Sequence, residues 1–248
     1  MNALISSSLL RPELRVGGLT PFSSIDCPGR LAAVVFAQGC PWRCSYCQNP
    51  HLQPRHAHGA AAAAAPGWAG LRPWLQRRVG LIDMVVFSGG EPTTDPGLPA
   101  AMAEVRALGY DVGLHTAGVA PKRLQGVLPL ADWVGLDIKA PLSDEAAHAR
   151  ITGVHGASAV VRQSLAALVA SGVAHECRTT IHPDLLDDAA LLRLADELST
   201  AGARHWALQV FRTTGCRGTL AAVGDGYPAP DTLSQLRERF PALVVRRD

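Results

Sequence analysis

The sequence predicts an α/β protein whose parallel sheet forms a partial (β/α)6, TIM-like barrel. The chain has 248 residues, and 48% of them are hydrophobic, which is enough for a substantial core. Short apolar, β-branched runs alternate along the chain with stretches of helical period, which implies right-handed crossovers and helices covering the sheet. Six such units are too few for a complete eightfold barrel. An open doubly wound sheet is the alternative.

The expected elements follow this alternation from one end of the chain to the other. We expect strands at residues 31–37, 81–87, 110–114, 133–138, 174–180 and 205–210. Helices are expected between and after them, at residues 68–79, 98–108, 122–128, 159–171, 187–199 and 232–240. Pro73 is expected to delay the start of the first helix. A short apolar run at 242–245 ends the pattern.

No linker rich in proline and glycine divides the chain, so we expect one domain over residues 1–248, with its core at about 16–216. Residues 56–66 depart from the pattern, because they include six consecutive alanines, Ala60–Ala65, beside Gly59 and Pro66. Alanine favours helix, but the flanking residues disfavour a long one. We interpret this segment as a variable surface insertion.

Charge and hydropathy exclude several classes of function. The formal net charge of +2 gives no electrostatic reason to bind nucleic acid or an anionic membrane surface. The first residues lack the basic and apolar regions of a signal peptide, and no run approaches the roughly 18 apolar residues of a membrane span. We therefore expect a cytoplasmic protein with no membrane or nucleic-acid partner.

Three of the six cysteines, Cys40, Cys44 and Cys47, stand at C-x3-C-x2-C spacing directly after the first expected strand. Soft thiolates favour zinc or iron–sulfur centres, and three of them can hold three irons of a cubane and leave the fourth iron open. A zinc site would need a fourth ligand, for which His51 is the local candidate. Zinc sites usually contain a second pair of ligands, and this chain has none.

A glycine turn follows the second expected strand. The segment Asp83–Thr93 reads DMVVFSGGEPT, so Gly89, Gly90 and Glu91 stand at the carboxyl end of that strand. Glycine lets the backbone approach a ligand without a Cβ in the way. Alone such a turn is a weak signal, but after the cysteine motif it predicts a binding site.

Polar residues also end the other strands, where barrels build their active sites. His115 and Thr116 follow the third strand, and Asp137 and Lys139 share one face at the end of the fourth. A structural ion pair is the alternative for Asp137 and Lys139. The remaining polar residues of this kind are Arg178 and Thr180 on the fifth strand, His182 just beyond it, and Gln209 on the sixth.

With the aromatic Tyr46 before the last cysteine, the cysteine motif resembles the signature of the radical S-adenosylmethionine (SAM) superfamily. The activases of glycyl radical enzymes are the most similar branch. Among them, the activating proteins of anaerobic ribonucleoside-triphosphate reductases fit best. The similar segments are DCPGR at 26–30, QGC at 38–40, CQNP at 47–50, FSGGEPT at 87–93, VGLDIK at 134–139 and RTTIHP at 178–183.

The resemblance implies one [4Fe–4S] cluster on Cys40, Cys44 and Cys47, which carry the catalysis through it, with SAM on the open iron. The residues implied to bind SAM are Tyr46, Gly89, Gly90, Glu91, Thr116, Asp137, Lys139 and His182. The glycine turn would accept hydrogen bonds from the SAM ammonium through its backbone carbonyls or through Glu91. His115 stands where we expect an aspartate in the pyruvate formate-lyase activase.

The implied activity is that of an oxidoreductase. Reductive cleavage of SAM gives a 5′-deoxyadenosyl radical, which removes hydrogen from a glycine of the partner protein. The implied partners are a glycyl radical protein, the anaerobic reductase, and flavodoxin or ferredoxin as electron donor. The candidates for binding the protein substrate are the loops at residues 212–226 and 51–58. The chain lacks the extra cysteine clusters of a ferredoxin-like module, so we expect Cys27, Cys177 and Cys216 to be free thiols. An approach of Cys216 to the site, from the loop after the sixth strand, is the less favoured alternative.

Two other functions remain open. The first is a radical SAM enzyme with a small-molecule substrate, similar to 7-carboxy-7-deazaguanine synthase, which the activase-like segment at 26–30 weakly disfavours. The second is a non-catalytic zinc or iron–sulfur binding protein. Colour separates the second from the others, because a zinc protein is colourless and an iron–sulfur protein is brown.

Overall fold

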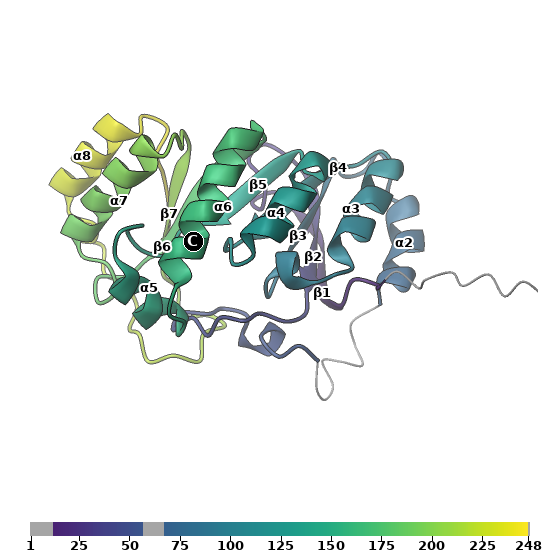
Figure 1. The fold of residues 1–248 in the computed structure, drawn as a ribbon, viewed down its shortest axis with the longest axis horizontal. Helices are drawn as coiled ribbons and strands as arrows, with labels where there is room; N and C mark the ends of the chain where they lie inside the picture. Colours follow the sequence, from purple (N-terminus) through teal and green to yellow (C-terminus); the bar gives the residue numbers. More distant parts are fainter. Residues whose placement is uncertain (1–11, 57–66, 248) are drawn as a thin grey trace, which may run out of the picture.

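The computed structural model describes residues 12–56 and 67–247, which fold around one eight-stranded sheet (Figure 1). The strands follow the order of the sequence across the sheet, β1 to β8. The first strand pairs with its neighbour antiparallel, and all the later pairs are parallel. The strands are β1 Val16–Ser23, β2 Ala32–Ala37, β3 Met84–Gly89, β4 Asp111–Thr116, β5 Trp133–Asp137, β6 Ala174–Ile181, β7 Trp206–Val210 and β8 Val244–Arg246.

Helices cover one face of this sheet (Figure 1). They are α2 Trp68–Gln76, α3 Leu98–Ala107, α4 Pro121–Val127, α5 Glu145–Thr152, α6 Ala157–Ser171, α7 Asp188–Thr200 and α8 Pro230–Arg239. Three short 3-10 helices join them, η1 Pro50–Leu52, η2 Pro92–Thr94 and η3 Leu128–Leu130. No helix among these described segments has the length and apolar character needed to cross a membrane.

The predicted partial barrel with its parallel sheet is confirmed, and two elements go beyond the expected pattern. The strand β1 has the sequence VGGLTPFS, whose glycines and proline hide its strand character. The helix α5 is short and polar, and Asp144 caps it by accepting from Ala147 N. The helix α2 begins at Trp68 and contains Pro73, so this proline does not delay its start. Most of the expected insertion at 56–66 lies outside the described residues.

The two faces of the sheet carry different clusters, because side chains alternate along each strand. Val35 and Phe87 point toward the helices and belong to the large core. Val34 and Val86 point the other way and form a small second cluster with Cys27. This second face is the concave side of the partial barrel.

The segment after β1 covers part of the concave side. The His115 ring, near the carboxyl end of β4, lies within hydrogen-bonding distance of the Asp26 carbonyl, with 2.7 Å between Nε2 and the oxygen. Cys27 is 3% exposed beside Val34 and Val86. The 26–30 segment that resembles the activases therefore packs on the concave side against β2, β3 and β4.

Candidate active site

The cysteine loop, residues 40–47, begins three residues after β2 at the carboxyl end of the sheet. Cys40, Cys44 and Cys47 are free and half-buried. Cys40 N donates to the Gln53 carbonyl at 3.0 Å, and Ser45 N donates to the Ile151 carbonyl at the end of α5 at 3.0 Å. The loop is thus held by backbone hydrogen bonds to segments on two sides.

The glycine turn after β3 packs directly against the start of this loop. Gly90 N donates to the Ala37 carbonyl at 2.9 Å, and Glu91 N donates to the Gly39 carbonyl at 2.9 Å. A Cβ on Gly90 would lie 2.4 Å from the Gly39 oxygen, a distance that real Cβ atoms do not reach. Glycine is required here by the close approach of two backbones. The structure therefore brings together the two motifs that the sequence singled out.

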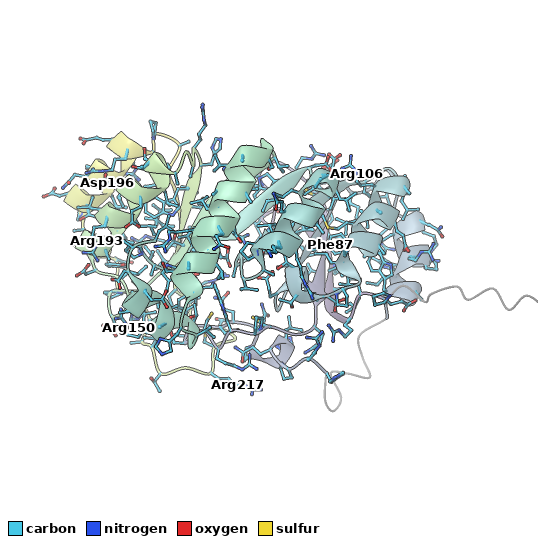
Figure 2. The ribbon with its side chains drawn as sticks, viewed as in Figure 1. Phe87, Arg106, Arg150, Arg193, Asp196 and Arg217 are labelled. Atoms are coloured by element: carbon cyan, nitrogen blue, oxygen red, sulfur yellow. The ribbon has the colours of Figure 1, made fainter. Side chains whose placement is uncertain are left out.

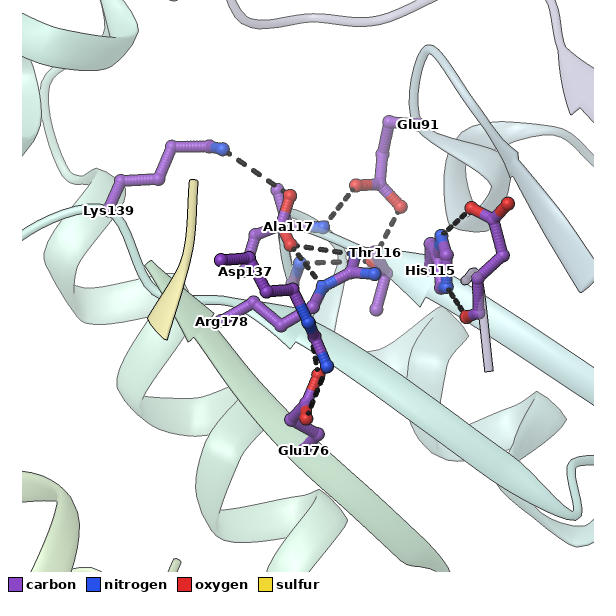
Figure 3. A network of polar contacts seen from close by, with 11 residues as sticks. Glu91, His115, Thr116, Ala117, Asp137, Lys139, Glu176 and Arg178 are labelled. Carbon is purple, nitrogen blue, oxygen red and sulfur yellow. Dashed lines mark hydrogen bonds and ion pairs between the residues drawn. The ribbon is translucent and has the colours of Figure 1, made fainter. Parts of the chain in front are cut away.

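The carboxylate of Glu91 is buried and accepts four hydrogen bonds. Its Oε1 accepts from Thr93 N and Thr93 Oγ1. Figure 3 shows the other two bonds, from Thr116 Oγ1 to Oε1 and from Ala117 N to Oε2 at 2.8 Å. These bonds occupy most of the acceptor positions of a carboxylate. Contact of Glu91 with the SAM ammonium stays a prediction, and the arrangement favours the turn's backbone carbonyls as the acceptors. Glu91 and Thr116 join the ends of β3 and β4.

A charged triplet lies at the ends of β5 and β6. Arg178 donates to Asp137 Oδ1 from Nε at 3.0 Å and from its NH2 nitrogen at 2.8 Å, and Lys139 Nζ lies 3.6 Å from Asp137 Oδ2. Figure 3 shows the Asp137 carboxylate between these two cations. Burial would raise the pKa of Asp137, but the Arg178 guanidinium and then Lys139 hold that pKa below its usual range. Asp137 is therefore an anion.

Lys139 connects this triplet to the cysteine loop. Its ammonium is 5.4 Å from the centre of the Tyr46 ring, and the residue is 8% exposed. Burial would lower the pKa of Lys139, but Tyr46, Cys44 and Asp137 raise it above its usual range. The Tyr46 hydroxyl is buried and has no hydrogen-bond partner among the described residues. Such an orphaned hydroxyl is uncommon in a native interior, and it is a group that a polar ligand at this site would satisfy.

His182 is buried at the end of β6 and both of its ring nitrogens have partners. Asp184 N donates to Nδ1 at 3.1 Å, so the proton lies on Nε2, which donates to the Ala221 carbonyl at 3.1 Å. The ring also meets Phe211 edge-on, with 5.4 Å between the ring centres. In this arrangement His182 fixes the loop after β7, and its predicted contact with SAM stays a prediction.

The loop after β7 also reaches the cysteine loop and brings Cys216 to it, which the sequence analysis gave only as the less favoured alternative. Cys216 is free, and its Sγ lies 3.1 Å from the Tyr46 carbonyl oxygen. Gly215 and Gly218 pack so closely that a Cβ on them would lie 2.7 Å from the Gln48 oxygen and 2.5 Å from the Ser45 oxygen. In the sequence, the only sign of this close approach is the pair of glycines on either side of Cys216.

The thiols suit an iron–sulfur cluster. Burial raises the pKa of Cys40 to about 12 and also raises the pKa of Cys44, so these thiolates need a cationic partner to form. A bound metal deprotonates a coordinating thiol, and the three cysteines share one loop beside the orphaned Tyr46 hydroxyl. In the described part of the chain, no group of three or more His, Cys, Asp or Glu side chains is arranged to hold a single metal ion.

His115 lies in the concave wall, next to Thr116 on β4. It is 8% exposed and faces Asp26, with its ring 5.6 Å from that of Trp133. Burial, and then Arg178, lower the pKa of His115 to about 3, so the ring is neutral. In this arrangement His115 holds the segment after β1, and its correspondence to an aspartate of the pyruvate formate-lyase activase stays a prediction.

The comparison with protein families identifies the class to which this site belongs. Residues 34–198 match the family model of the radical SAM superfamily. The matched segment begins in β2 and includes the cysteine loop, the glycine turn and the charged triplet. The chain therefore belongs to the radical SAM superfamily, whose members use a [4Fe–4S] cluster and SAM.

Individual proteins support the same fold. A glycyl-radical enzyme activating enzyme of Methanocaldococcus jannaschii is 26% identical over 180 residues, which cover 70% of each chain. A 7-carboxy-7-deazaguanine synthase of Thermococcus kodakarensis is 38% identical over 76 residues, 30% of this chain and 28% of that protein. The structure of SuiB from Streptococcus suis, bound to the precursor peptide SuiA, has a TM-score of 0.67 at 12% identity. It covers 86% of this chain, which spans about half of SuiB (48%).

Proposed function

We propose that this protein is a glycyl-radical-enzyme activase, and that its target is an anaerobic ribonucleoside-triphosphate reductase. The observation that carries the proposal is the direct attachment of the glycine turn to the cysteine loop, with Lys139 beside that loop. These segments combine a place for a cluster with cationic and backbone groups for the amino-acid part of SAM. The resulting enzyme would be an oxidoreductase.

In this proposal Cys40, Cys44 and Cys47 hold the cluster. The backbone carbonyls of Gly89 and Gly90 would accept hydrogen bonds from the SAM ammonium. When bound, the reduced cluster and SAM supply the 5′-deoxyadenosyl radical that takes a hydrogen atom from glycine.

Two side chains then orient SAM. Lys139 faces the methionine carboxylate, because its ammonium is buried and retains its charge. Asp137 fixes Lys139 and is itself held by Arg178. Tyr46 lies against the ligand, and its orphaned hydroxyl gains a partner there. Glu91, Thr116 and His182 position the surrounding loops.

The breadth of the similarity favours an activase. The relative named as a glycyl-radical enzyme activating enzyme matches over 70% of this chain, whereas the 7-carboxy-7-deazaguanine synthase matches over 30%. The 26–30 segment, which resembles the activases, is an integral part of the barrel through Asp26 and Cys27. The choice of the reductase as target rests on the overall resemblance of the motifs. Flavodoxin or ferredoxin would supply the electron.

The second candidate is a radical SAM enzyme that acts on a small molecule. It is favoured by the higher identity, 38%, of the short match to 7-carboxy-7-deazaguanine synthase. Such an enzyme would cleave SAM productively with a small heterocyclic substrate and without any partner protein.

The test is to mix the anaerobically reconstituted, reduced protein and SAM with a candidate anaerobic reductase. The proposal predicts the doublet of a glycyl radical in the electron paramagnetic resonance spectrum of the reductase. A reductase with its radical glycine replaced by alanine is the matched control. Abundant 5′-deoxyadenosine without that doublet would contradict the assignment, and product formation with a deazaguanine precursor would establish the second candidate.

A further inference from the structure

The outer rim of the cysteine loop carries arginines and no acidic residues. Two segments form this rim, residues 38–56 and residues 211–224. Neither contains an aspartate or a glutamate. Their arginines are Arg43, Arg55, Arg212 and Arg217, and all four are exposed. We refer to these four residues as the arginine rim.

Contacts place both segments against the cysteine loop. A Cβ on Gly39 would lie 3.4 Å from the Arg55 Cα, so Arg55 packs beside the start of the loop. On the other segment, Cys216 Sγ lies 3.1 Å from the Tyr46 carbonyl oxygen, which holds the neighbouring Arg217 at the end of the loop. Figure 2 shows Arg217 at the lower edge of the molecule.

The four charges of the arginine rim have no acidic partner among the described residues, and unlike other unpaired arginines they gather on the two segments beside the cysteine loop. Among the described residues, the side chains of Arg55, Arg212 and Arg217 form no hydrogen bond or ion pair. Arg43 donates only to carbonyl oxygens of its own loop, those of Cys40 at 2.7 Å and Trp42 at 2.8 Å. Elsewhere the ion pairs include Arg15–Asp95, Arg72–Glu104, Arg106–Asp132, Arg239–Asp196 and Arg246–Glu176.

We propose that the arginine rim is the docking surface for an acidic one-electron donor protein. This inference rests on the proposed function, since it assumes that the cysteine loop holds the cluster. The donor loses one electron and the iron–sulfur centre behind the rim gains it, with no bond made or broken. A cluster of exposed like charges without partners attracts a surface of opposite charge and raises the rate of encounter.

The position of the rim favours an electron donor over the substrate protein. A substrate glycine must reach the concave side of the barrel, where Lys139 and Asp137 lie at the strand ends. The arginines lie instead on the outside of the cysteine loop. An electron donor needs only to approach the cluster, so it can dock outside while the concave side is occupied.

The test is charge reversal at three arginines whose side chains bind nothing within the described residues, R55E/R212E/R217E. The control, R77E/R204E/R237E, makes the same change in net charge at exposed arginines away from the cysteines. Both variants are reconstituted anaerobically, and bleaching of the cluster absorbance by reduced flavodoxin, an acidic donor, is followed by stopped flow. Photoreduced deazaflavin, a neutral small reductant, serves in parallel and shows whether each cluster is intact.

The proposal predicts that the rim variant is reduced by flavodoxin at least about tenfold more slowly at low ionic strength. The difference should shrink as salt screens the charges. Reduction by deazaflavin should match the wild type, and the control variant should stay within about twofold of it. Equal rates of reduction by flavodoxin for the rim and control variants would overturn the proposal.

A second arm separates the donor from the substrate protein. If the rim variant, reduced by deazaflavin, forms less glycyl radical while its reduction by flavodoxin is normal, the rim binds the substrate protein and the proposal is wrong. Cluster reduction is measured without any glycyl radical protein. Failure of the activase assignment would therefore leave this result intact.

Discussion

Two regions of the barrel use buried charge in different ways. At the bottom, by which we mean the part of the concave wall lined by His115, Glu176 and Arg246, the charged and polar groups satisfy one another: Glu176 accepts two hydrogen bonds from Arg246, at 2.9 and 3.0 Å, and His115 pairs with the Asp26 carbonyl. At the top, the cysteine thiols are free, and the Tyr46 hydroxyl lacks a partner among the described residues.

The difference separates stability from function. The pairs at the bottom offset much of the cost of burying their own charged and polar groups, and removing one partner would leave the other buried without compensation. The top keeps thiols, a charged lysine and an orphaned hydroxyl that gain partners only when a ligand is present. Substitutions at the top should therefore alter cofactor binding, and substitutions at the bottom should alter stability.

The largest effect is expected from Cys44→Ala, because the cluster would then have two cysteine ligands instead of three. Cluster content should fall to background, as measured by iron and sulfide analysis and by the brown absorbance. Cys177→Ala is the control, since this free cysteine is 0% exposed in the core. A full cluster in the Cys44 variant would break the assignment of the top as a cluster site.

Gly90→Ala should be the next most harmful change. The new Cβ would stand 2.4 Å from the Gly39 oxygen and 2.9 Å from the Leu52 oxygen, both of them backbone atoms. The cysteine loop must then shift, so SAM affinity should fall at least about tenfold, measured by equilibrium dialysis, with about 1–3 kcal/mol of lost stability. Gly126→Ala, where nothing lies within 4 Å of the new Cβ, should be neutral or stabilising.

Lys139→Ala should weaken SAM binding about tenfold, which corresponds to about 1.4 kcal/mol, while the cluster stays intact. The reason is the loss of the buried ammonium beside Tyr46 and Asp137. Dialysis and the cluster absorbance measure the two properties separately. Unchanged SAM affinity would remove Lys139 from the site and leave it as a structural ion pair.

At the bottom, Glu176→Gln should lower stability by about 1–3 kcal/mol. The cause is the loss of the paired charge for Arg246, since Glu176 is 6% exposed. SAM affinity should not change. The exposed pair of Arg239 with Asp196 provides the control, and Asp196→Asn should cost less than about 1 kcal/mol. Thermal unfolding under argon measures the stability of both variants. Reduced SAM affinity in the Glu176 variant would contradict the distinction between the top and the bottom.

The last effect concerns pH, and it is small only near neutral pH. Burial and then Arg178 lower the pKa of folded His115 from 6.5 to about 3. In the pH range between these two values, the unfolded chain binds a proton at His115 that the folded chain does not. This contribution to stability is present above pH 6.5 and falls by about 1.4 kcal/mol per pH unit as the pH drops through this range.

His115→Asn should therefore show a smaller fall in melting temperature between pH 7 and about pH 5.5 than the wild type. The exposed His155 gives the control variant, His155→Asn, which should keep the wild-type fall. An equal fall in melting temperature for the wild type and both variants would show that His115 is not buried as a neutral ring.

The sequence predicted the parallel barrel and the meeting of its two main motifs, because strand–helix alternation and the carboxyl ends of strands follow general rules. It could not predict that the Glu91 carboxylate accepts from Thr116 and Ala117, since these hydrogen bonds join the ends of two strands. It allowed an approach of Cys216 to the cysteine loop but could not establish it, because the contact spans 170 residues of chain. Such contacts depend on loop conformation, which carries no periodic signal.

The most direct test of the account is the formation of 5′-deoxyadenosine from SAM by the anaerobically reconstituted and reduced protein, with Cys44→Ala beside it. The account predicts product from the wild type and none from the variant, with the reductase present if the protein substrate is required for cleavage. Equal product from both proteins would show that the cysteine loop is not the source of the chemistry. A complete cluster that forms no product, even with the reductase, would contradict the proposed activity.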